Sequence, residues 1–189
     1  MKPFALRSSL AMLLPMAFSA MFWQLTLPAR ADEAPSIPAL SVKLGGFLPT
    51  QSNMKDAAGQ SWWAFGVDYR PPFHYHPLGA NIHLGADIVW HGTGNQSYNV
   101  TDVTGKLVWG ITPLGSHPRV WGGLGGGLYY INTPHMAGNP TGGAKFIMGI
   151  DFTDRVFFEA DYDWVGGFTD SIGTDLRVDG VTLALGVRF

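Results

Sequence analysis

The last nine residues, Val181-Thr-Leu-Ala-Leu-Gly-Val-Arg-Phe189, alternate with a strict period of two. Large apolar side chains occupy every odd position, whereas the even positions hold threonine, alanine, glycine and arginine. Alternation of this kind over several residues is typical of a β-strand whose two faces meet different surroundings. The stretch therefore predicts a C-terminal strand with one uncharged, bulky face.

The same period continues back along the chain to Ser41, interrupted by Gly, Pro, Asn and Asp. No segment between the strands has the apolar helical spacing that a parallel sheet requires, so consecutive strands are expected to pair antiparallel. Eight such strands close into an up-and-down barrel whose interior side chains just fill it. The eight candidate strands are residues 41–48, 61–70, 80–90, 98–111, 120–131, 142–152, 156–167 and 177–189.

Charge separates the two faces of these strands. One face carries no charge and is rich in aromatic residues, whereas the other carries thirteen charged or ionisable groups. A soluble lipocalin-like barrel would place its charges outward in water and its apolar face inward. Here the apolar face is too continuous for that arrangement. An uncharged face suits contact with lipid, where a charge is costly. The charged face suits the narrow interior of a closed barrel, where charges must pair. The pattern predicts a transmembrane β-barrel with these residues inside: Lys43, Asp68, Arg70, His83, Asp87, Asp102, Lys106, Lys145, Asp151, Glu159, Asp161, Asp163 and Arg188.

Outward aromatic residues gather near the predicted strand ends, where aromatic girdles meet the two membrane interfaces. The alternative is that aromatic residues are simply common in strands. The outward set is Trp63, Tyr69, Trp90, Trp109, Tyr130, Phe152 and Trp164, and the inward aromatic residues are Trp62, Trp121 and Tyr129.

The N-terminus has the features of an export signal. Lys2 and Arg7 precede an apolar run that ends in Ala29-Arg30-Ala31. This predicts a cleaved signal peptide over residues 1–31 and a short periplasmic linker over residues 32–40, followed by the barrel domain, residues 41–189. The alternative is an uncleaved membrane anchor. Removal of residues 1–31 takes away three basic residues and no acid, which changes the net charge from −2 to −5.

Composition excludes several classes of protein. Only 14% of residues are charged and 46% are hydrophobic, which excludes a disordered chain. Cysteine is absent, so thiol catalysis, disulfide scaffolds and cysteine-ligated metals are excluded. The acidic balance gives no reason to expect a nucleic-acid partner.

From Ser41 to Phe189 the chain resembles the small eight-stranded outer-membrane barrels of the OmpA, OmpX and OmpW type. The terminal aromatic residue with alternating apolar residues before it carries the resemblance. It implies an assembly signal of Leu185, Val187 and Phe189, read by the barrel-assembly machinery. It also implies a monomer in the outer membrane of a diderm bacterium, in contact with outer-membrane lipids and lipopolysaccharide.

The connections place the barrel's two ends. With both ends of the barrel domain in the periplasm, the periplasmic turns are residues 71–79, 112–119 and 153–155. The outer loops are only moderately long, which gives less support to an adhesion or receptor role. They span residues 49–60, 91–97, 132–141 and 168–176.

Candidate chemical sites are few. His74 and His76 are two residues apart, but no further metal ligands accompany them, so a turn with exposed histidines is expected and no metal. The glycine-rich segment 122–127 lacks the lysine and helix of a phosphate loop, and is expected to bend its strand or to make room for inward aromatic residues. His83 and Asp87 share the inward face without a suitably placed serine, and no His-x-Ser motif of lipid A deacylases occurs. No catalytic residue and no cofactor is therefore predicted.

The inward charges are expected to form a salt-bridge network that largely plugs the lumen, with Lys43, Asp68, Arg70, Asp151, Glu159 and Arg188 together in the periplasmic half. The expected role is structural or envelope-supporting. The alternatives are a narrow pore for small or hydrophobic molecules, as in OmpW, and a lipid-modifying enzyme of the envelope. The expected network contains Lys43, Asp68, Arg70, Asp87, Asp102, Lys106, Lys145, Asp151, Glu159, Asp161, Asp163 and Arg188.

Overall fold

The computed structural model describes residues 40–70, 74–75, 82–93, 98–111, 118–134, 136–169, 173 and 175–189. The predicted signal peptide lies outside these residues, as does the predicted linker except for Leu40. Eight long strands of the described chain are β1 (Leu40–Pro49), β2 (Trp62–Tyr69), β4 (Ile82–Gly92), β5 (Asn99–Gly110), β6 (Arg119–Thr133), β7 (Met136–Asp151), β8 (Val156–Val165) and β11 (Gly180–Arg188). The shorter elements are α2 (Ser52–Ala58), β3 (His74–Tyr75), β9 (Phe168–Thr169) and β10 (Asp175–Leu176).

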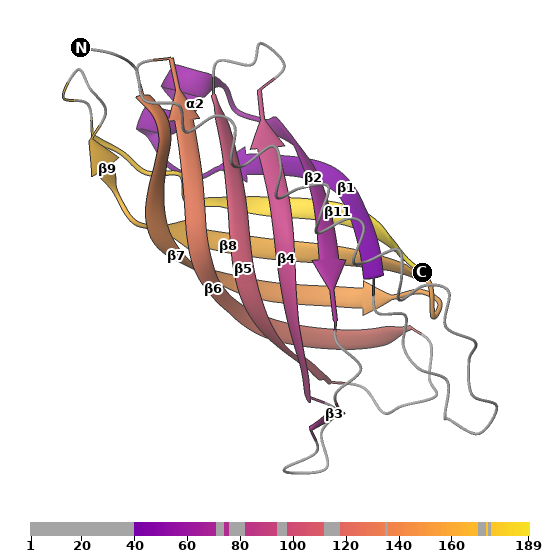
Figure 1. Cartoon of the computed structure of the whole chain (residues 1–189). Helices are drawn as coiled ribbons and strands as arrows, with labels where there is room; N and C mark the ends of the chain where they lie inside the picture. Colours follow the sequence, from indigo (N-terminus) through magenta and orange to yellow (C-terminus); the bar gives the residue numbers. More distant parts are fainter. Residues whose placement is uncertain are drawn as a thin grey trace, which may run out of the picture. The chain divides into compact units, whose positions relative to one another are not determined.

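The long strands form one closed antiparallel barrel (Figure 1). Their order around the barrel is β2-β1-β11-β8-β7-β6-β5-β4, and pairing of β2 with β4 completes the circle. β3 adds two residues to the same edge of β4 that β2 occupies. The predicted eight-stranded up-and-down fold is confirmed.

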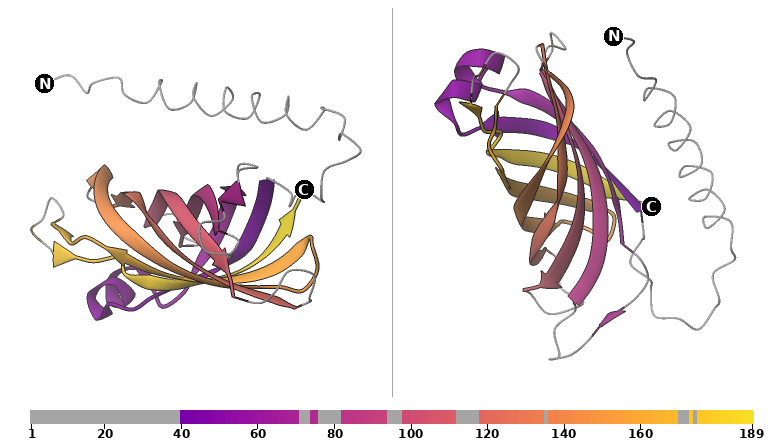
Figure 2. Two further views of the ribbon diagram at one scale, coloured as in Figure 1. Left: turned by 90° about the horizontal axis from the view of Figure 1, so that it is seen from below. Right: turned by 60° about the vertical axis from the view of Figure 1, so that its left-hand side comes forward.

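The first and last strands meet as the sequence predicts. β1 and β11 pair from Ser41 opposite Arg188 to Pro49 opposite Gly180. The Phe189 amide then donates to the Leu40 carbonyl oxygen at 2.8 Å. We call this end of the barrel the terminal end and the opposite end, which carries α2, the helix end (Figure 2). No helix among the described residues has the length and apolar character needed to cross a membrane.

Side chains alternate between the lumen and the outer surface along the long strands, wherever the structure describes them. Leu185 and Phe189 are each 59% exposed on the outside, whereas Ala184 and Arg188 are buried inside. Twenty-three large apolar side chains are exposed among the described residues, and the predicted outward aromatic residues Trp63 and Trp164 are among them. The predicted inward aromatic residues Trp62, Trp121 and Tyr129 are buried. The face assignment made from sequence therefore agrees with the structure.

Three connections differ from the sequence expectation. Residues 49–60, predicted as a loop, contain α2, whose Met54 is buried against the barrel mouth. Residues 132–141 were expected to form an outer loop, but β6 and β7 extend into them as a long hairpin that pairs Thr133 with Met136. β9 and β10 form a small separate hairpin inside the predicted loop 168–176. Packing at the barrel rim orders segments whose own sequence has only turn-forming character.

Candidate functional site

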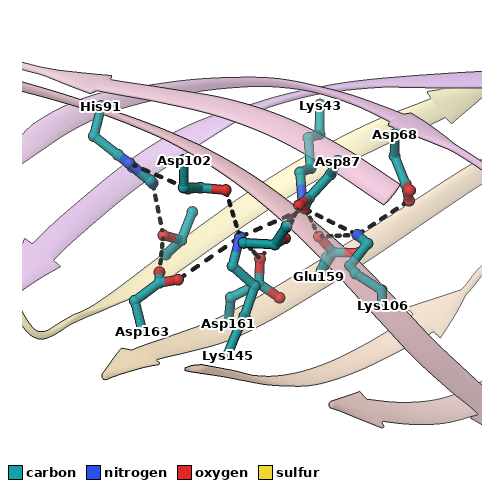
Figure 3. Close-up of polar contacts among 12 residues, drawn as sticks. Lys43, Asp68, Asp87, His91, Asp102, Lys106, Lys145, Glu159, Asp161 and Asp163 are labelled. Atoms are coloured by element: carbon teal, nitrogen blue, oxygen red, sulfur yellow. Dashed lines mark hydrogen bonds and ion pairs between the residues drawn. The ribbon is translucent and has the colours of Figure 1, made fainter. Parts of the chain in front are cut away.

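Charged side chains from six strands meet inside the lumen, nine in all, and most of their contacts can be followed in Figure 3. We call this group the charged belt. Every member is at most 3% exposed, so lysines and carboxylates that are normally solvated are buried together. The belt consists of Lys43 on β1, Asp68 on β2, Asp87 on β4, Asp102 and Lys106 on β5, Lys145 on β7, and Glu159, Asp161 and Asp163 on β8.

Lys43 lies at the centre of three carboxylates. Its Nζ is 3.0 Å from Asp87 Oδ2 and 3.5 Å from Asp161 Oδ2, and it also donates to Glu159 Oε1. Ligand oxygens of the three acids lie within 4.8 Å of one another, a spacing that could hold a metal ion. The lysine ammonium group is the cation that these carboxylates surround.

The other two lysines share the same acids. Lys106 Nζ is 3.2 Å from Asp68 Oδ2 and 3.0 Å from Asp87 Oδ2. Lys145 Nζ is 3.1 Å from Asp102 Oδ1 and 3.4 Å from Asp87 Oδ2. Asp87 therefore joins all three lysines, and the belt is one connected network.

Glycines on neighbouring strands make room for these long side chains. A Cβ atom at Gly66 would lie 2.8 Å from Lys43 Cε, which is closer than real Cβ contacts allow. At Gly125 a Cβ would lie 3.2 Å from the Gly105 carbonyl oxygen, and it would meet Lys145 Cβ at 3.4 Å and Lys106 Cγ at 3.5 Å in ordinary van der Waals contact. In the glycine-rich segment 122–127, Cβ atoms at Gly123, Gly125 and Gly127 would each lie nearest to a backbone carbonyl oxygen of β5. These glycines therefore allow close approach of β5, and the nearest atoms include no inward aromatic side chain, contrary to that part of the expectation.

His91 forms a polar chain that the sequence analysis missed. Its Nε2 is 3.1 Å from Thr182 Oγ1, and that hydroxyl donates to Asp163 Oδ2 at 3.4 Å. The Tyr129 hydroxyl donates to the other oxygen of Asp163 at 2.7 Å. The predicted strand ended at residue 90, so His91 fell in a predicted loop. A predicted strand longer by one residue would have included His91 and placed it on the same inward face as Asp87.

An apolar cluster fills the lumen at the helix end, and we call it the outer cap. Asp179 fixes the segments around it, because its Oδ1 accepts from the Val165 amide at 2.8 Å and its Oδ2 from Gln51 Nε2 at 3.0 Å. The cap consists of Phe47, Met54, Trp62, Val100, Tyr129, Ile131, Val165, Phe168, Leu176 and Val178.

A mixed aromatic and ionic layer fills the terminal end, and we call it the inner layer. Arg188 Nη2 donates to Asp151 Oδ1 at 2.7 Å, and its guanidinium lies 4.4 Å from the centre of the Phe157 ring. Trp121 Nε1 also donates to Asp151 Oδ1 at 2.8 Å, and the Arg70 guanidinium lies 5.0 Å from the Trp121 ring centre. Val108 and Ile147 pack with these two aromatic rings.

Each of the twelve residues expected in the lumen network makes at least one ion pair. The six that were expected together in the periplasmic half are divided between two groups. Lys43, Asp68 and Glu159 belong to the belt, whereas Asp151 and Arg188 belong to the inner layer. Arg70 lies between the groups, 3.7 Å from Asp68 and against Trp121.

The expected assembly signal of Leu185, Val187 and Phe189 is exposed on the outer surface. His74 and His76 were expected to be exposed, but their side chains are not among those that the structure describes. Asp87, which is predicted to share the inward face with His83, contacts the three belt lysines.

No protein-family model and no curated protein sequence matches this chain. Among solved structures, one from a study of the de novo design of transmembrane β-barrels is similar to this chain, with a TM-score of 0.50 and 13% sequence identity. The alignment covers 83% of this chain and 98% of the designed one. The outer-membrane protein Ail of Yersinia pestis, in a phospholipid bilayer nanodisc, aligns with a TM-score of 0.45 and 12% sequence identity. That alignment covers 80% of this chain and 99% of Ail. The fold is that of an eight-stranded transmembrane β-barrel.

Proposed function

We propose that this chain is an outer-membrane barrel of a diderm bacterium with a structural, envelope-supporting role and a lumen closed to diffusion. In this proposal it is exported by a signal peptide, residues 1–31, acts as a monomer and carries out no chemistry. Its partners are outer-membrane lipids and lipopolysaccharide, and the barrel-assembly machinery during biogenesis.

The observation that carries the proposal is the filling of the lumen at three levels. The charged belt occupies the middle, with members at most 3% exposed, and the outer cap and inner layer occupy the two ends. Eight strands leave an interior just wide enough for side chains. A solute would have to displace paired charges and packed aromatic rings, which supports a closed lumen over a narrow pore.

The outer surface supports residence in lipid. Leu124, Phe146 and Met148 are 46–62% exposed and lie on adjacent strands. Lysine or arginine at the middle of such a surface costs about 2–4 kcal/mol in a bilayer, which accounts for the apolar character of the outer face of the described strands.

Planar-bilayer recording tests the closed lumen. The purified barrel, inserted into a bilayer, is expected to give no discrete conductance steps. Steps in the wild-type protein that change in Lys106→Ala, whose side chain lies in the belt, and persist in Leu124→Ala, whose side chain faces outward, would establish the narrow pore instead. Steps that neither variant changes would indicate passage outside the belt and would equally contradict a closed lumen.

The proposed assembly role of Phe189 is tested by deleting it. The deletion removes the exposed Phe189 ring and the amide that donates to the Leu40 carbonyl oxygen, at the end of the chain that pairs with β1. We therefore expect less folded protein in the membrane fraction of cells. Phe152→Ala is the matched control, because Phe152 is 51% exposed near the same end of the barrel and lies outside the C-terminal strand. Equal amounts of folded protein in both variants would contradict the assembly signal.

A further inference from the structure

Three arginines gather around one carboxylate at the terminal end of the lumen. Arg188 Nη2 donates to Asp151 Oδ1 at 2.7 Å, and Arg119 Nε lies 3.5 Å from Asp151 Oδ2. The Arg70 guanidinium lies 5.0 Å from the ring centre of Trp121, whose Nε1 donates to Asp151 Oδ1 at 2.8 Å. We call Arg70, Arg119 and Arg188 the arginine cluster.

Several N–H donors of the arginine cluster have no acceptor. Among the described residues, Nε and Nη2 of Arg70, Nε of Arg119, and Nε and Nη1 of Arg188 are buried without a hydrogen-bond partner. Asp68 Oδ2 lies 3.7 Å from Arg70 Nη2, which is beyond hydrogen-bond distance, and 3.2 Å from Lys106 Nζ. A buried charged donor without an acceptor is unfavourable, so the cluster has room for a further acceptor group.

The cluster also carries more positive charge than its surroundings neutralise. Arginine stays protonated in proteins, so three guanidiniums beside the buried carboxylate of Asp151 leave a surplus of positive charge. Asp154 accepts from the cluster at 2.8 Å, but it is 74% exposed at the rim, where the exposed side chain of Arg155 offsets it. The connections at this end, residues 71–81 and 112–118, contain no aspartate or glutamate.

The cluster is open to solvent at the terminal end. The side chains of Arg70 and Arg119 are 11% and 16% exposed, whereas members of the charged belt are at most 3% exposed. The Arg188 side chain is 1% exposed and lies against the Phe157 ring. A ligand that enters from the terminal end would therefore meet Arg70 and Arg119 without passing the charged belt.

We propose that the arginine cluster binds a phosphate group at the terminal end of the barrel. A guanidinium presents its donors as a planar fork that matches two phosphate oxygens, and arginine is the side chain most suited to such recognition. A phosphate monoester carries about 1.5–2 negative charges near pH 7, which fits the surplus of positive charge. The phosphate belongs either to a lipid headgroup at the membrane surface or to a free phosphate in solution. The site does not depend on whether the lumen conducts.

The wild-type barrel in uncharged detergent micelles tests the site by NMR of the arginine Nε–Hε groups. These groups report binding directly, because Nε is without a partner in all three cluster arginines. The two probes, added at constant ionic strength, are inorganic phosphate and short-chain phosphatidylglycerol. We expect saturable shifts of the cluster signals at millimolar concentrations or below. Shifts with inorganic phosphate identify a site for free phosphate, and shifts with the lipid alone identify a headgroup site. No saturable shift with either probe would overturn the proposal.

Two variants separate a built site from general attraction by positive charge. Arg70→Gln removes one fork of the cluster and is expected to weaken binding at least about tenfold. Arg155→Gln is the matched control, because it removes the same charge from an exposed position at the same end. It is expected to weaken binding less than about threefold, since exposed charges are screened by salt. Unchanged affinity in Arg70→Gln, or an equal loss in both variants, would overturn the proposal. If Arg70→Gln does not fold, Arg119→Gln takes its place with the same expected loss, and wild-type affinity in that variant would equally contradict the site.

Discussion

The charged belt and the outer cap fill the same lumen by different physics. Phe47 in the cap is 1% exposed and Lys43 in the belt is 2% exposed, so burial alone does not distinguish them. The cap is held by apolar contact, which is non-directional and tolerates changes that keep volume. The belt is held by ion pairs whose loss leaves a partner charge buried. The comparison shows that a narrow barrel can be filled by either means. We expect the ionic part to be the more sensitive to substitution.

Removal of the central lysine is expected to have the largest effect. Lys43→Met leaves Asp87, Glu159 and Asp161 facing one another without the ammonium group between them. Breaking a buried ion pair in this way costs about 3–5 kcal/mol of unfolding free energy. Urea unfolding in detergent micelles, followed by gel mobility without boiling, measures the loss.

The control for this change is Lys55→Met on α2. Lys55 is exposed, so its replacement is expected to change the unfolding free energy by less than about 0.5 kcal/mol. Equal effects of Lys43→Met and Lys55→Met would show that the belt lysine does not hold the carboxylates together.

Truncation in the outer cap is expected to have a smaller effect. Met54 is fully buried where α2 meets the barrel mouth, and Met54→Ala should cost about 2–4 kcal/mol through lost apolar contact and a residual cavity. Because no charge is involved, the loss should be the same in low and high salt in the same unfolding assay. A Met54→Ala barrel as stable as the wild type would mean that α2 does not close the lumen.

Overfilling of the inner layer is expected to have the smallest effect. A Cβ atom at Gly149 would overlap the Trp121 ring, so Gly149→Ala should cost about 1–3 kcal/mol as the ring shifts. Gly142 on the same strand has open space where its Cβ would lie, and Gly142→Ala is the matched control. If both alanine variants unfold at the same urea concentration, the inner layer is not tightly packed.

The strands and their two faces could be predicted because period two marks every one of them. α2 could not, since seven residues are too short for a helical period and the helix is stabilised by burial of Met54 in the barrel mouth. The extended hairpin of β6 and β7 was hidden by Pro134, Gly138 and Pro140, residues that usually mark a loop.

The membership of the charged network could be predicted from the alternation of faces, but its grouping could not. Strands of a closed barrel are tilted and staggered. Residues at the same distance from the ends of their own strands therefore lie at different heights along the barrel axis. Glu159 therefore meets Lys43 and Lys106, whereas Asp151, on the adjacent strand, meets Arg188. His91 was missed for a simpler reason, because its strand extends two residues beyond the predicted end.

The central claim is that this chain forms a closed barrel that lies in a membrane. The most direct measurement is gel mobility of the detergent-extracted outer-membrane fraction, loaded with and without boiling. A closed, detergent-resistant barrel is expected in that fraction, and it should migrate faster before boiling than after it. A protein recovered in the soluble periplasmic fraction with no shift on boiling would contradict the account and would favour a soluble ligand-binding barrel.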